Sequence, residues 1–172
     1  MTTHDSELAT LFLKHSRKRL IDEHWIHLNA CVEPMTVEQV WWRPNDVSNS
    51  VGNLILHLNG NVTQWLVASF NRDEDKRDRP TEFSATGGLT AAELLERLGA
   101  TVAEAAKVLD RLTVDELLAP YEIQGYRVRG LDAVYQVVEH FGLHYGQIAY
   151  IAKCLSGKDL GFYKELNKTG RV

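Results

Sequence analysis

Cysteine is scarce in this sequence, with Cys31 and Cys154 as the only two in 172 residues. A small secreted scaffold held together by disulfides would contain more of them. We therefore interpret both residues as buried thiols that pack as small hydrophobic side chains. The first seven residues also lack the basic start and the apolar core of a signal peptide. These absences predict a cytoplasmic protein.

An excess of positive charge and a long apolar run are also missing. The formal net charge is −4 at pH 7, so no broad positive surface would attract nucleic acid. No apolar run approaches the roughly 20 residues that cross a bilayer. We expect no nucleic-acid partner and no membrane partner, and we expect a small-molecule substrate instead.

Apolar residues recur at three- and four-residue spacings over four long stretches, at about 6–32, 50–70, 90–112 and 131–155. Such spacing is typical of amphipathic helices. The composition, 44% hydrophobic and 24% charged, is that of an ordinary globular protein. We predict an all-α fold, a four-helix bundle in which residues 1–172 form a single domain.

Capping signals mark where several helices begin. A Ser or Thr followed three residues later by Glu or Gln satisfies two backbone donors reciprocally. This pattern occurs at Thr36–Gln39, Thr90–Glu93 and Thr113–Glu116. Either Asn49 or Ser50 can cap the second long helix.

Two of the connections have a recognisable character. Residues 71–80 carry charges of both signs that nearly cancel, which favours a solvated loop over a binding patch. We expect this segment to be a long connection between helices. Residues 121–130 alternate polar and apolar side chains around Gly125, which predicts a small β-hairpin before the last helix.

Two histidines of the last helix, His140 and His144, are four residues apart. This spacing places them on one face of the helix, about 6 Å apart along its axis. The same face carries the apolar side chains of Val137, Ile148 and Ile151, so both rings are expected to face the core. Two imidazoles placed in this way can bind one metal ion.

His57 supplies a third candidate ligand from a different helix. It lies within the apolar segment 54–58, and a buried imidazole needs partners for both ring nitrogens. Three histidines on facing helices would leave coordination positions open, as catalytic metal sites do. The alternative is a metal-free core in which the histidines pair with Asn53, Asn61 or backbone carbonyls.

Each metal-binding histidine also needs an acceptor for its second ring nitrogen. The nearby candidates are Asn53, Asn61, Glu139 and Gln147, and their spacing does not choose among them.

The other paired histidines look different. His24 and His27 lie beside Asp22 and Glu23 on what we interpret as a polar face of the first helix. We expect a surface pair there.

Glycines flank the candidate ligands. Gly142 and Gly146 surround His144, and Gly52 and Gly60 bracket His57. Because glycine destabilises a helix interior by about 1 kcal/mol relative to alanine, its presence indicates a close approach, either by another helix or by a ligand.

The segments 50–61 and 139–148, with Trp41-Trp42-Arg43-Pro44 ahead of the first, carry a family resemblance. They resemble the DinB/YfiT-like superfamily of metal-binding four-helix bundles, which includes bacillithiol- and mycothiol-dependent enzymes. The resemblance covers nearly the whole chain in helix order. It implies that His57, His140 and His144 hold a divalent ion. Nickel or zinc is the expected metal, and iron or manganese is the alternative. The resemblance also implies a homodimer, for which Trp41, Trp42 and the first helix could form an interface, although those residues could equally be core.

The leading functional hypothesis is a metal-dependent enzyme, such as a low-molecular-weight-thiol S-transferase. A metal ion held by three imidazoles would remove the proton from a bound thiol near neutral pH. Neither cysteine of the chain is needed as the nucleophile, because the thiol would be a small cofactor.

Two alternatives stay open. A metal-dependent hydrolase would need a general base, for which Glu139 is adjacent to His140 but rotated about 100° around the helix. A non-catalytic, metal-stabilised binding or stress-response module would keep the site for folding energy or ligand capture. No clear fourth ligand is found, although Tyr121, Glu122 and Tyr126 of the hairpin could reach the mouth of the site.

Overall fold

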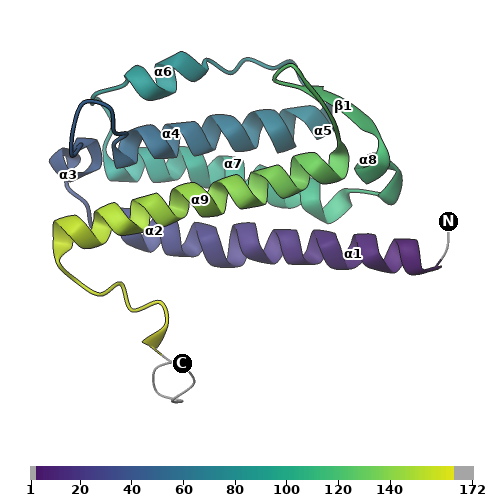
Figure 1. The fold of residues 1–172 in the computed structure, drawn as a ribbon, viewed down its shortest axis with the longest axis horizontal. Helices are drawn as coiled ribbons and strands as arrows, with labels where there is room; N and C mark the ends of the chain where they lie inside the picture. The colour runs from purple at the N-terminus through teal and green to yellow at the C-terminus, as the bar shows by residue number, and fades with distance from the viewer. Residues whose placement is uncertain (1–2, 165–172) are drawn as a thin grey trace.

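The computed structural model describes residues 3–164, and its long helical segments lie side by side (Figure 1). The first comprises α1 (Thr3–Arg17), a π-helical segment η1 (Lys18–Trp25) and α2 (Ile26–Val32). The second comprises α4 (Val51–Val62), a π-helical segment η2 (Thr63–Ala68) and α5 (Ser69–Asn71). The third is α7 (Ala91–Arg111) and the fourth is α9 (Gly130–Ser156). The expected all-α bundle is confirmed.

Shorter helices occupy the connections: α3 (Val37–Trp41), α6 (Arg79–Ser84) and α8 (Val114–Leu118). Helix α6 begins within the segment 71–80, for which the charge pattern predicts a loop. Asp78 caps this helix by accepting a hydrogen bond from the backbone of Thr81, and Pro80 lies in its first turn, where a missing N–H costs nothing. The charged connection therefore ends two residues earlier than expected, at Asp78.

The predicted helix starts are confirmed. Thr36, Ser50, Thr90 and Thr113 each form a reciprocal capping box with the residue three positions later. At Ser50 the reciprocal partner is the amide of Asn53, which has a second role near the histidines described below.

The β-hairpin is confirmed between α8 and α9. Strands β1 (Pro120–Ile123) and β2 (Tyr126–Arg129) pair antiparallel. The two turn residues, Gln124 and Gly125, have φ values of 55° and 81°, which suits the tight turn of a twisted hairpin.

The hairpin packs at the Asn71 end of the second long helix. The ring of Tyr121 lies 4.8 Å from that of Phe70, and Tyr126 lies 6.4 Å from Trp65. Trp65 follows His57 by two helical turns, about 12 Å. The expectation that hairpin side chains reach the histidines is therefore wrong.

Apolar side chains from all the long helices form one core, with Phe141, Leu20, Leu28, Ile55, Leu58 and Leu66 among its largest fully buried members. Cys31 is buried within it, whereas Cys154 is exposed, so the expectation of two buried thiols holds for Cys31 alone. Within residues 3–164 no helix combines the length and the apolar character needed to span a membrane.

Candidate metal centre

The structure brings His57 of α4 together with His140 and His144 of α9. One ring nitrogen from each lies within 4.8 Å of the others. His57 is buried, with 4% of its surface exposed, and the other two are half-buried. The helical spacing of His140 and His144 and the packing of α4 against α9 produce this convergence. These three histidines could hold a metal ion.

The ring geometry fits one shared cation. His57 Nε2 and His140 Nε2 are 2.8 Å apart, and the three ring centroids lie 4.4–5.0 Å from one another. Two nitrogens bound to one ion at 2.0–2.1 Å and at right angles would be about 2.9 Å apart. The contact is a hydrogen bond between the two rings in this structure, and its length is also compatible with two neighbouring ligands of one metal ion.

Hydrogen bonds behind two of the rings place the proton on the outer nitrogen and leave the inner nitrogen unprotonated. His57 Nδ1 donates to Glu82 Oε2 over 2.8 Å, so its Nε2 carries the lone pair. His144 Nδ1 donates to Gln147 Oε1 over 2.7 Å, which leaves its Nε2 free in the same way. Such outer partners fix the tautomer and the orientation of a metal-binding imidazole.

Burial keeps the two α9 imidazoles uncharged at neutral pH. It lowers the pKa of His140 to about 4, with further contributions from His144 and His57. It also lowers the pKa of His144. An unprotonated imidazole is the form that binds a metal, so the donor set fits a divalent ion.

Glu82 of α6 contacts the histidine cluster without having been predicted from the sequence. Its side chain is 9% exposed and lies against Arg77, whose side chain is 5% exposed. Arg77 Nε donates to Glu82 Oε1 over 2.7 Å, and Arg77 Nη2 donates to Oε2 over 2.9 Å. Burial alone would raise the pKa of Glu82, but hydrogen bonds from Arg77 and His57 lower it. A charged carboxylate therefore faces His57.

A chain of hydrogen bonds holds Arg77 in turn. Arg77 Nη1 donates to Gln64 Oε1 over 2.9 Å, and Gln64 Nε2 donates to Asp75 Oδ2 over 2.6 Å. The expected solvated loop is largely exposed, but Arg77 is an exception, because its side chain turns inward to neutralise Glu82.

Gly60 is the sequence signal that could have located this pair. A Cβ at position 60 would lie 2.0 Å from Glu82 Oε1 and 2.8 Å from Arg77 Nε. Only a glycine leaves room for the ion pair against α4. The close approach expected at Gly60 is confirmed, and at Gly52 the ring of Trp41 takes the corresponding space, 2.9 Å from a Cβ there.

Of the expected outer partners, Gln147 is confirmed. Asn53 instead ties α6 to α4, because its Nδ2 donates to the backbone oxygens of Glu82 over 2.9 Å and Ala85 over 2.8 Å. Asn61 is buried, and its Oδ1 has no hydrogen-bond partner in the described part of the chain. Glu139 is exposed. The metal-free pairing with Asn53 or Asn61 is not what the structure shows.

The expected surface pair is wrong at His24. His24 is 8% exposed, and its Nε2 would lie 3.0 Å from a Cβ at Gly142. His24 follows Leu20 by four residues and precedes Leu28 by four, and all three are buried, so the spacing itself carried the signal. His27 is half-buried, with its ring stacked on Phe162 at 4.3 Å.

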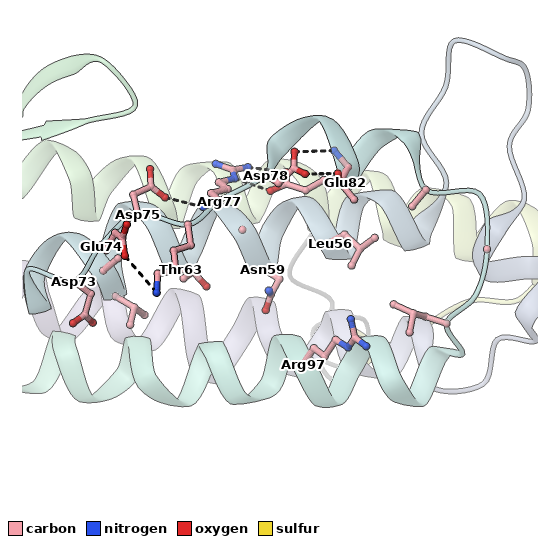
Figure 2. A pocket seen from close by; sticks show the side chains of 18 of the residues that line it. Leu56, Asn59, Thr63, Asp73, Glu74, Asp75, Arg77, Asp78, Glu82 and Arg97 are labelled. Carbon is pink, nitrogen blue, oxygen red and sulfur yellow. Dashed lines mark hydrogen bonds and ion pairs between the residues drawn. The ribbon is translucent and has the colours of Figure 1, made fainter.

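Two cavities adjoin the hydrogen-bond partners of the histidines, Glu82 in one case and Gln147 in the other. The first, of about 680 Å³, is lined by α4, α6, α7 and the 73–78 segment. Figure 2 shows Arg77 and Glu82 along one side of this cavity and Arg97 of α7 across from them. The second, of about 730 Å³, lies between the 42–49 segment and α9 and includes Gln147.

Comparisons with known proteins agree with this architecture. The model of the DinB superfamily matches residues 20–148, a range that contains all three histidines. A crystal structure of a conserved protein from Enterococcus faecalis has a TM-score of 0.63, with 18% identical residues, over 92% of this chain and 99% of that one. At this identity the likeness establishes the fold alone. No curated protein matches the sequence.

Proposed function

The chain belongs to the DinB superfamily, and from this premise we propose that His57, His140 and His144 bind a divalent metal ion in a metal-dependent enzyme. The single observation that carries the proposal is the convergence of three ring nitrogens within 4.8 Å. The hydrogen bonds from His57 to Glu82 and from His144 to Gln147 support it, because they leave the inner nitrogens of both rings unprotonated.

The proposed reaction is transfer of a low-molecular-weight thiol to an electrophilic carbon. When bound, a divalent ion supplies positive charge that lowers the pKa of the thiol, so that the thiolate forms near neutral pH. The three histidines leave coordination positions for small molecules. Glu82 and Gln147 hold two of the rings in place, and Arg77 keeps Glu82 charged. Nickel or zinc is the expected ion, with iron or manganese as alternatives.

The geometry favours transfer over hydrolysis. A hydrolase would want a free carboxylate as general base beside the ion. Glu82 is occupied by His57 and Arg77, and Glu139 is exposed. A purely structural site would be closed by a fourth protein ligand. The described residues contribute three to this group, which supports a catalytic site.

Elemental analysis of protein purified without a metal-affinity tag tests the metal site. We expect about one divalent ion per chain. His140→Ala should abolish it, since two histidines hold an ion far more weakly than three. His15→Ala is the matched control because His15 is exposed on α1. A tag-free wild-type protein that takes up no nickel, zinc, iron or manganese would overturn the proposal.

The reaction is tested with metal-loaded protein and a halogenated aromatic acceptor. We expect turnover with one of bacillithiol, mycothiol or glutathione, and loss of turnover in His140→Ala. Absence of turnover with all three thiols would exclude the S-transferase and leave the hydrolase or the non-catalytic module.

The homodimer remains a proposal, to be tested by light scattering. Trp41 is half-buried, and its indole N–H donates to the backbone oxygen of Leu89 over 2.8 Å, so its role is in the monomer core. Trp42 is 40% exposed.

A further inference from the structure

The cavity of about 730 Å³ beside α9 differs in chemistry from the one beside Glu82. None of its lining residues carries a charge: Trp42, Pro44, Val47, Ser48, Asn49, Leu54, Leu143, Gly146, Gln147, Tyr150, Ile151 and Cys154. We call this cavity the α9 groove. The cavity beside Glu82 is lined by eight charged side chains, among them Arg77, Glu82 and Arg97.

The lining of the α9 groove indicates the chemistry of its ligand. Large apolar side chains around it remain exposed: Val47 at 95%, Tyr150 at 70%, Leu143 at 54% and Trp42 at 40%. Covering them with an apolar molecule removes their surface from water, which is favourable. A charged molecule would lose hydration without meeting an opposite charge. The groove therefore suits an uncharged, largely apolar small molecule, and its volume is in the usual range for such sites.

The α9 groove adjoins the hydrogen-bond partner of His144, although none of the three histidines lines it. Leu143 and Gln147 line it, and they flank His144 on the same helix. Gln147 Oε1 accepts the hydrogen bond from His144 Nδ1, while its amide NH₂ group can donate to an oxygen of a ligand. A molecule in contact with Gln147 is thus one hydrogen bond away from His144.

Gly146 lines the α9 groove. A Cβ at this position would meet nothing within 4 Å, so the packing of the described residues does not require glycine there. Glycine costs about 1 kcal/mol relative to alanine in a helix interior. By contrast, Gly142 is explained by the ring of His24 against it. The open space beside Gly146 is part of the α9 groove.

We propose that the α9 groove binds the uncharged, largely apolar part of the substrate in contact with Gln147, the outer partner of His144. The inference rests on the proposed function, for which it names the class of acceptor: an uncharged aromatic or aliphatic electrophile. The electrophile would take the sulfur of the thiol, and its leaving group would depart with the electron pair of the broken bond. The thiol proton would pass to solvent.

The test compares Gly146→Phe with Gly146→Ala, because phenylalanine fills the groove and alanine does not. The probe is N-phenyl-1-naphthylamine, an uncharged aromatic dye that fluoresces in apolar surroundings. We expect the wild-type protein and Gly146→Ala to bind the dye, and Gly146→Phe to bind it at least about tenfold more weakly. Circular dichroism and elemental analysis should show all three folded, with the same metal content.

The position of the groove is tested with cobalt in the metal site. Adding the dye to the cobalt protein should shift its visible absorption bands, because the ligand lies against the partner of His144. Equal binding by Gly146→Phe would overturn the groove as the site, and unchanged cobalt bands would overturn its place beside His144. If a second copy of the chain covers the groove, Gly146→Phe would break a dimer without any dye binding, which also overturns the proposal.

These results separate the groove from the metal. If the protein takes up no metal but binds the dye, and Gly146→Phe does not bind it, the α9 groove stands as a binding site and the proposed function is rejected. If the protein takes up metal but does not bind the dye, the proposed metal site stands and the α9 groove is rejected as a binding site.

Discussion

Replacing Glu82 by glutamine should weaken metal binding although Glu82 does not touch the ion. The carboxylate accepts from His57 through Oε2 and from Arg77 through both oxygens. An amide keeps one oxygen and presents an NH₂ group in place of the other. If the NH₂ faces His57, Nδ1 must become an acceptor and the proton moves to Nε2, the nitrogen that would bind the metal. If the NH₂ group faces Arg77 instead, it meets the guanidinium N–H groups, and both partners are hydrogen-bond donors.

The size of the effect follows from these contacts. Losing the outer partner of a metal-binding histidine typically costs 10- to 100-fold in metal affinity, or about 1.4–2.7 kcal/mol. We expect Glu82→Gln within this range. The metal-free variant should also be less stable, because Arg77 is buried and loses its counter-charge.

Metal affinity is measured by competition with a chelating dye, and stability by urea unfolding of the metal-free protein. Glu139→Gln is the matched control, since it makes the same chemical change on an exposed residue next to His140. Combining Glu82→Gln with Arg77→Met removes the unpaired cation. This double variant should recover stability and leave metal affinity low. Wild-type affinity in Glu82→Gln would refute the role of Glu82 in orienting His57.

Three further predictions concern neighbouring positions. Gly60→Ala should destabilise the protein by about 1–3 kcal/mol, because its Cβ would collide with Glu82. Gly146→Ala should instead stabilise it by up to about 1 kcal/mol. If urea unfolding showed that both substitutions change the unfolding free energy in the same direction, the packing described for these two glycines would be contradicted. Burial first, and then the neighbouring imidazoles, lower the pKa of His140 from 6.5 to about 4. The unfolded chain therefore binds a proton in this range that the folded protein does not, and the unfolding free energy of chelator-treated protein should fall as the pH drops from about 6.5 to 4. His140→Gln should reduce that dependence. Asn53→Ala should weaken metal binding, because it removes the hydrogen bonds that hold α6, and with it Glu82, against α4. An unchanged metal affinity in the chelator competition would show that α6 does not need these hydrogen bonds.

The bundle and the convergence of the three histidines could be predicted from sequence because both depend on helical periodicity. His140 and His144 share a face by spacing alone. His57 follows because an imidazole within an apolar stripe points to the same core. The capping boxes also located the helix starts, and the alternation around Gly125 predicted the hairpin that β1 and β2 form.

Glu82 could not be predicted in this way. It lies 25 residues from His57, on a short helix that follows a charged segment, and no periodic pattern relates the two positions. Which of the charged side chains turns inward is decided by tertiary packing. His24 is a different failure, since it is four residues from Leu20 and from Leu28, and the acidic residues beside it suggested a polar face.

The glycines of the two histidine helices link these successes and failures. A glycine in a helix interior predicts that something approaches closely, but not what approaches. Gly52, Gly60 and Gly142 each lie against a side chain from another segment of the described chain. Glu82, which periodicity missed, is one of those side chains. Nothing within residues 3–164 approaches Gly146, although it costs the helix as much as the others. Gly146 instead lines the α9 groove, where a Cβ would meet open space.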